Sequence, residues 1–126
     1  MQIQRVPQLL LTGALTPPAF AAQHIVDIHW DRAGAFAHAR LVPAGKFLEV
    51  CVALKVWDTV RRRFAAIALV DNDVHYHVGK SAEDLTRLTQ AAAGDKMPPV
   101  GATETYCWMW TNKSTGEVRV DPQLQR

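Results

Sequence analysis

Hydrophobic and polar positions alternate along much of the chain beyond residue 22, which is the pattern of β-strands with one buried face. The longest alternating segment runs from Phe47 to Trp57, and its even-numbered positions are all aliphatic: Leu48, Val50, Val52, Leu54 and Val56. Successive side chains of a strand point to opposite faces of its sheet. We therefore expect these aliphatic residues to face the core and Cys51 to face away from it.

Six further segments alternate in the same way or form short apolar runs between turn residues: Ile25–Trp30, Ala35–Val42, Phe64–Val70, Val74–Val78, Thr105–Thr111 and Glu117–Val120. The stretch from Pro43 to Gly45 predicts a turn, because proline presets the backbone at its second position. The stretch from Asp71 to Asp73 predicts another turn. The residues from Asn112 to Gly116 are expected to close a hairpin between the last two segments.

One segment, from Ser81 to Ala93, has the features of a helix. Ser81 can cap its N-terminus, acidic residues occupy its first turn, and Leu85 and Leu88 share one helical face. Gly94 is expected to end it. The pattern therefore predicts one short helix in a chain that otherwise consists of strands.

These elements predict an all-β fold: a small antiparallel β-sandwich, similar to a jelly roll, with one short helix. A chain of 126 residues is close to the usual size of one domain. We expect residues 1–22 to be a leader and residues 23–126 to form a single β-sandwich domain. A nucleotide-binding domain beside a separate substrate domain would not fit within this length.

The first 22 residues have the layout of a secretory signal peptide. A single cation, Arg5, precedes an apolar stretch from Val6 to Leu15, and small residues follow up to Ala21 and Ala22. The stretch falls short of the roughly 20 apolar residues that a membrane-spanning helix needs, so a retained anchor is the weaker alternative. Cleavage after Ala21 or Ala22 would leave a periplasmic or secreted protein with no transmembrane anchor.

The sequence contains two cysteines, Cys51 and Cys107. In an oxidising compartment, a small and even number of cysteines favours a disulfide. A bridge between them would close a long loop, for which the chain-entropy account gives about 4 kcal/mol of stabilisation. A reduced pair in a cytosolic protein and cysteine ligation of a metal are the alternatives.

Two of the expected strands resemble the closing half of the Golgi-dynamics (GOLD) β-sandwich domain: Asp73-Val74-His75-Tyr76-His77-Val78 and Tyr106-Cys107-Trp108-Met109-Trp110-Thr111-Asn112. The chain is also similar to small exported bacterial proteins of unassigned function that carry His-Tyr-His and Tyr-Cys-Trp-Met-Trp strands. The GOLD resemblance, over residues 45 to 122, implies a β-sandwich that takes part in protein interactions and contributes no catalytic residues. The sequence departs from GOLD cargo receptors in lacking their transmembrane helix, so vesicle trafficking is not implied.

His75 and His77 are two positions apart on one expected strand, so both imidazoles leave the same face and can converge on one ion. Met109 lies on another strand. If the two strands are neighbours, His75, His77 and Met109 would form a nitrogen and sulfur site suited to copper, with His24, His29 or His38 as a further ligand. The alternative is that the histidines cover one sheet face and Met109 fills a gap against Trp57.

Aromatic and basic residues provide two other candidate surfaces. Tyr106, Trp108 and Trp110 share one strand face and could form a ligand surface, although such a stripe is more often part of a core. The run Arg61-Arg62-Arg63 fits the solvated end of a strand, and an anionic surface or a lipid headgroup is its alternative partner.

The remaining features argue against catalysis and nucleic-acid binding. The charge is nearly balanced, with 14 Lys and Arg against 12 Asp and Glu, which disfavours nucleic acid. The sequence has no Gly-x-Ser-x-Gly element and no glycine-rich phosphate loop, so no catalytic site is expected. We therefore predict an exported binding or accessory module without a cofactor, whose partner is a protein of the cell envelope. The alternative is a periplasmic copper- or zinc-binding protein that uses His75 and His77.

Overall fold

The computed structural model describes residues 23–79, 81–97 and 99–126, and the expected signal peptide lies outside this part of the chain. The described residues form eight strands and no helix: β2 Gln23–Asp27, β3 Ala35–Ala37, β4 Arg40–Val42, β5 Phe47–Leu54, β6 Arg61–Val78, β7 Ser81–Lys96, β8 Glu104–Thr111 and β9 Val118–Gln125. Consequently, this part of the chain contains no helical segment able to cross a membrane. The all-β fold class is confirmed.

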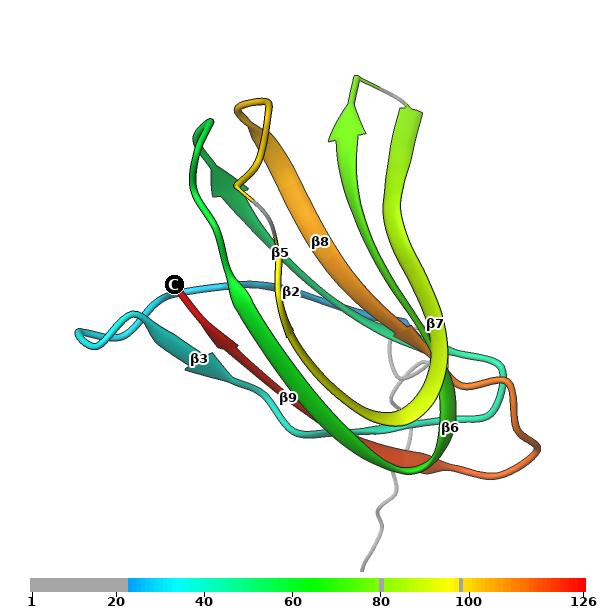
Figure 1. The fold of residues 1–126 in the computed structure, drawn as a ribbon. Coiled ribbons are helices and arrows are strands. Elements are labelled where there is room, and N and C mark those ends of the chain that lie inside the picture. Colours follow the sequence, from blue (N-terminus) through cyan, green and yellow to red (C-terminus); the bar gives the residue numbers. More distant parts are fainter. Residues whose placement is uncertain (1–22, 80, 98) are drawn as a thin grey trace, which may run out of the picture.

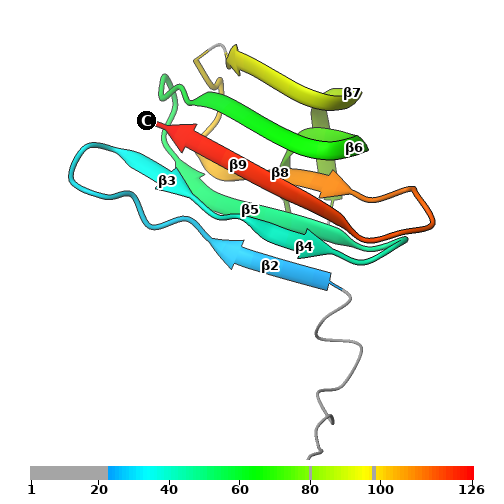
Figure 2. The ribbon, with the colours of Figure 1, turned by 90° about the horizontal axis from the view of Figure 1, so that it is seen from below.

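The strands form one curled sheet in the order β2-β5-β8-β6-β9-β3 (Figure 1). Strand β4 also pairs with β9, and β7 pairs with β6. Figure 2 shows β7, β6 and β9 side by side. All pairs are antiparallel except β2 with β5, which is parallel, so the sheet is mixed rather than antiparallel throughout.

The long strand β6 folds this sheet over on itself. Its first part, from Arg61 to Ala66, pairs with β9, and its second part, from Asp71 to His77, pairs with β8. The residues from Ile67 to Leu69 are not paired with β7, β8 or β9, so the pairing of β6 is interrupted there. The strand bends between these parts (Figure 1), so the sheet forms a half-barrel whose two halves face each other as the layers of a sandwich do.

The core lies between the two halves. As expected, Leu48, Val50 and Leu54 of β5 are buried there and Val52 packs against them, but Val56 lies beyond the end of β5 and is 43% exposed. Phe64 comes from one half and Trp110 from the other. Their rings meet in an edge-to-face contact, with centroids 5.7 Å apart. The buried apolar residues are Ile28, Val42, Leu48, Val50, Leu54, Val60, Phe64, Val70, Val74, Val100, Tyr106, Trp108, Trp110, Val118, Val120 and Leu124.

The prediction of a helix from Ser81 to Ala93 is wrong, because this segment belongs to strand β7. It runs antiparallel to β6 from the pair Val78 and Ser81 to the pair Arg61 and Lys96. Helix propensities differ by less than 1 kcal/mol per residue among ordinary amino acids, and pairing along 16 residues of β7 outweighs such local preferences. Leu85, which suggested a buried helical face, is 46% exposed.

The turn expected from Asp71 to Asp73 is also wrong, because these residues lie inside β6. Asn72 is fully buried, accepts a hydrogen bond from Arg62 and donates one of 2.9 Å to the carbonyl of Met109. Partners within the fold thus satisfy polar groups that a local reading assigns to a turn. The expected segments 64–70 and 74–78 are consequently parts of one 18-residue strand.

The expected hairpin across Asn112 to Gly116 is wrong as well. Strand β8 lies between β5 and β6, whereas β9 pairs with β3, β4 and β6, so the connection passes from one half of the sheet to the other. Asn112 is fully buried there, and its amide donates to the carbonyls of Val42 and Gly116 at 2.9 and 2.8 Å. The turn at Pro43 to Gly45 is present, since Lys46 N–H donates to the carbonyl of Pro43 at 3.1 Å.

Candidate functional site

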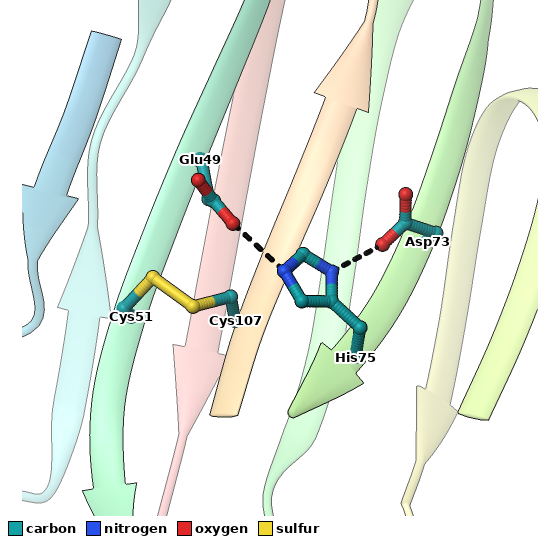
Figure 3. The surroundings of a disulfide bond; sticks show 5 residues. All are labelled: Glu49, Cys51, Asp73, His75 and Cys107. Atoms are coloured by element: carbon teal, nitrogen blue, oxygen red, sulfur yellow. Dashed lines mark hydrogen bonds and ion pairs between the residues drawn. A yellow bond between two sulfur atoms is a disulfide. The ribbon is translucent and has the colours of Figure 1, made fainter. Parts of the chain in front are cut away.

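A buried histidine, His75, lies between two carboxylates on the sheet. His75 Nε2 lies 2.9 Å from Glu49 Oε2, and His75 Nδ1 lies 2.6 Å from Asp73 Oδ1 (Figure 3). The side chains of His75, Glu49 and Asp73 are 8%, 12% and 7% exposed, respectively. Burial on this scale is unusual for ionisable groups unless they are paired with one another.

Strand register brings the three residues together. Strand β8 lies between β5 and β6, so Met109 is opposite both Glu49 and Asp73, and Cys107 is opposite both Cys51 and His75. Because all of these positions are odd-numbered, their side chains leave the sheet face that points away from the core. The polar cluster and the core therefore occupy opposite faces of the same three strands.

Cys51 and Cys107 form a disulfide beside this cluster (Figure 3). They are directly opposite each other on β5 and β8, with Cα atoms 4.1 Å apart and sulfur atoms 2.09 Å apart. The expected pairing is thus present, and Cys51 faces away from the core as its parity predicts. In this state neither sulfur is a thiolate, which is the form that binds metal.

The two contacts of His75 involve both nitrogens of its ring. A neutral imidazole carries one N–H group and can donate to one acceptor, whereas the imidazolium donates from both nitrogens. Both ring nitrogens of His75 face carboxylate oxygens, so the donor and acceptor roles in these two contacts depend on which nitrogen carries a proton.

His77 stands next to this triad on the same face, and it is exposed to solvent. Its ring centroid lies 4.9 Å from that of His75, with the planes at 78°. One donor atom each from Glu49, His75, His77 and Cys107 lies within 4.8 Å of the others. The structure therefore brings His75 and His77 together as the sequence predicts and adds Glu49, which the sequence analysis missed because no local pattern links β5 to β6.

The other histidines and Met109 have different positions. Met109 is half-buried and lies opposite Asp73, two register positions from His75. His24 stacks on His38 with ring centroids 5.4 Å apart, and neither belongs to the cluster around His75. Burial lowers the pKa of His24 below 6.5, and Arg40 and His38 add to this effect. His29 lies beside a separate surface hollow.

The prediction of an aromatic ligand surface is wrong. Tyr106, Trp108 and Trp110 are buried in the core, and each is at most 2% exposed. The Tyr106 hydroxyl donates to the carbonyl of Ala102 at 2.7 Å. Burial raises the pKa of Tyr106 above 10.0; the bond to Ala102 opposes this shift, and Tyr76 and Glu104 add to it.

The arginine run is divided between the two faces of β6. Arg61 and Arg63 are exposed, as expected for a solvated strand end, but Arg62 is 1% exposed and points into the core. The Arg62 guanidinium donates to Asn72 Oδ1 and lies 5.7 Å from the centroid of the Phe64 ring. Alternation along a strand explains this result, because Arg62 has the same parity as the core residue Phe64.

Arg61 and Arg63 line a hollow of about 460 Å³ on the outer face of β3, β9 and β6, which we call the arginine hollow. Two rows of paired residues form its base: Ala35, Gln125 and Arg61 in one row, and Ala37, Gln123 and Arg63 in the other. The small alanines leave space beside the longer side chains. The remaining lining residues are His29, Asp31, Phe36 and Leu124.

No protein-family model matches the sequence, and the comparison with curated proteins found no match. Its fold is similar to the crystal structure of PliG from Aeromonas hydrophila, a periplasmic inhibitor of g-type lysozyme, with a TM-score of 0.59 and 8% identity over 82% of this chain and 96% of PliG. It is also similar to the pre-peptidase C-terminal domain of collagenase from Bacillus anthracis, with a TM-score of 0.55 and 6% identity over 82% of this chain and 94% of that domain. These likenesses show a small β-rich fold, while the resemblance to GOLD stays a prediction.

Proposed function

We propose that this protein is an exported, periplasmic β-sandwich module that binds a protein partner through the arginine hollow and performs no catalysis. The observation that carries the proposal is the chemistry of the hollow. Arg61 and Arg63 offer two guanidinium groups, and Gln123 offers an amide beside them. Arginine is enriched among the residues that contribute most to protein interfaces, because its planar group donates several hydrogen bonds at once.

The composition of the hollow indicates the kind of segment that it would bind. Its lining contains two arginines and one acid, Asp31, so the local charge is positive. An acidic or carbonyl-rich segment would complement these donors. The small side chains of Ala35 and Ala37 leave room for such a segment to approach the sheet.

Export is supported by two independent features. The leader pattern of residues 1–22 predicts translocation and cleavage after Ala21 or Ala22. The disulfide between Cys51 and Cys107 suits the oxidising periplasm. The similar fold of PliG, a periplasmic inhibitor of g-type lysozyme, supports the same location and class of function.

Export can be tested by expressing the full chain and fractionating the cells. We expect the protein in the periplasmic fraction, with a mass that corresponds to cleavage after Ala21 or Ala22. Recovery of the uncleaved chain from the cytoplasm would contradict export.

Partner binding can be tested with the protein recovered from that fraction. Immobilised protein should capture an envelope protein, and the double change Arg61→Ala with Arg63→Ala should abolish the capture. Arg119→Ala is the matched control, because Arg119 is an exposed arginine of β9 outside the hollow. A g-type lysozyme is the first purified partner to test. Capture that is equally strong with the double variant would refute the role of the hollow.

A further inference from the structure

We propose that Glu49, His75 and His77 form a binding site for a divalent transition-metal ion of the zinc class, with Asp73 as the residue that orients His75. This inference is independent of the arginine hollow, because it concerns the opposite end of β6, where this strand pairs with β8 in the other half of the folded sheet. It also changes the ligand set expected from the sequence, since a carboxylate takes the place of the Met109 thioether.

The first support is the convergence of donor atoms. Ligand atoms of a tetrahedral zinc site lie about 3.3 Å apart, given bonds of about 2.0 Å. The contact between Glu49 Oε2 and His75 Nε2 is already 2.9 Å, and one donor atom each from Glu49, His75 and His77 lies within 4.8 Å of the others. His77 is exposed, so its side chain can rotate toward an ion without disturbing the core.

The second support is the contact on the far side of His75. Histidines that bind a metal through one nitrogen usually donate the other N–H group to a carboxylate or carbonyl, which fixes the tautomer and the ring orientation. Asp73 Oδ1 lies 2.6 Å from His75 Nδ1 and so directs Nε2 toward Glu49. Asp73, His75 and Glu49 thus already have the relative positions of an orienting carboxylate, a histidine ligand and an acidic ligand.

The chemistry of the donors restricts the ion. Two imidazoles and one carboxylate suit zinc and its transition-metal neighbours, whereas calcium and magnesium prefer all-oxygen sites. The sulfur of Cys107 is bonded to Cys51, so this state offers three protein donors and leaves a fourth position for water or another ligand. Glu49 and His75 are buried while His77 is exposed, which gives the ion a route of entry at the His77 side.

The test is a zinc titration of the oxidised protein in competition with a chromophoric chelator. We expect one zinc ion per chain with a dissociation constant below about 10 μM. Glu49→Gln and His77→Ala should each weaken binding at least tenfold, and Asp73→Asn should weaken it by about 10- to 100-fold, as for other groups that orient a ligand. Cobalt(II) should give the visible absorption of four-coordinate metal in the wild-type protein and lose it in His77→Ala.

Two variants serve as matched controls. His29→Ala removes a histidine outside the cluster and should leave the zinc affinity unchanged. Met109→Leu should also leave it unchanged, which separates this ligand set from one containing the thioether. His77 is exposed, so His77→Ala is expected to fold, and urea unfolding of each variant verifies this. Absence of saturable zinc binding, or binding that neither Glu49→Gln nor His77→Ala weakens, would overturn the proposal.

Discussion

Phe64 and Trp110 meet edge to face, with 5.7 Å between their ring centroids, although their strands are not paired at these positions. Phe64 is opposite Pro122 of β9, and Trp110 is opposite Leu48 and Asn72. The two rings therefore connect the halves of the folded sheet across the core. Such aromatic pairs contribute about 0.5–1.5 kcal/mol beyond the burial of their surface.

Phe64→Ala should accordingly destabilise the protein by about 3–5 kcal/mol, because it leaves a cavity between the two halves. Urea unfolding followed by tryptophan fluorescence measures the change in the free energy of unfolding. Ile67→Ala is the matched control on the same strand, since Ile67 is 76% exposed, and its effect should be within about 0.5 kcal/mol. Equal effects of the two changes would contradict this assignment of the core.

Removing the disulfide through Cys51→Ala with Cys107→Ala should lower the free energy of unfolding by about 4 kcal/mol. The bridge joins residues 56 positions apart, and the chain-entropy account relates this separation to the freedom lost by the unfolded chain. Urea unfolding of the oxidised protein and the double variant gives the difference. A variant as stable as the oxidised protein would show that strand pairing alone holds β5 to β8.

Asn72→Ala should destabilise the fold by roughly 2–3 kcal/mol. The change removes an acceptor of the buried Arg62 guanidinium and the donor to the Met109 carbonyl, and a buried polar group that loses its partner is costly. The double change Arg62→Met with Asn72→Leu should be less destabilising than the sum of its parts, because it removes the buried charge as well. Additive effects in this double-mutant cycle would show that the two side chains do not act together.

Stability should fall as the pH rises above 10.0, in part because of Tyr106. Its pKa in the folded protein is raised above 10.0, chiefly by burial, so the unfolded chain releases this proton first. Its contribution is therefore fully present below pH 10.0 and declines from there toward the folded-state pKa. Ultraviolet titration of the two tyrosines should show one delayed ionisation, and Tyr106→Phe should remove it. Retention of the delayed phase in this variant would assign it to Tyr76.

Trp57→Asn should stabilise the protein by about 0.5–1 kcal/mol. Trp57 has a positive φ of 81° and is 77% exposed, and asparagine tolerates this left-handed conformation better than an aromatic residue does. Thermal or urea unfolding measures the gain. Val56→Asn is a control at the neighbouring position, which lacks the positive φ, and it should not stabilise the protein.

The predicted features that are present in the structure are those that depend on local alternation. The parity of β5 places Leu48 and Val50 in the core and Cys51 on the other face, because alternation is a property of any extended strand. His75 and His77 share a face for the same reason. The small number of cysteines made their pairing straightforward to predict.

The features that the sequence analysis predicted wrongly depend on partners far away in the chain. The segment from Ser81 to Ala93 has the local preferences of a helix, but its pairing with β6 decides its conformation. Asn72 has the preferences of a turn residue, but Arg62 and Met109 satisfy its amide within a strand. Glu49 carried no signal at all, since its role depends on the order β5-β8-β6.

The sequence by itself determined that this chain forms strands, which faces of those strands are apolar, and which two cysteines can pair. These properties follow from side-chain periodicity and composition, which act over a few residues. The tertiary structure alone decided that β6 is one bent strand, that Arg62 is buried while Arg61 and Arg63 line a hollow, and that Glu49 meets His75. Those properties depend on the order and register of strands, which are fixed by the free energy of the whole packed sheet.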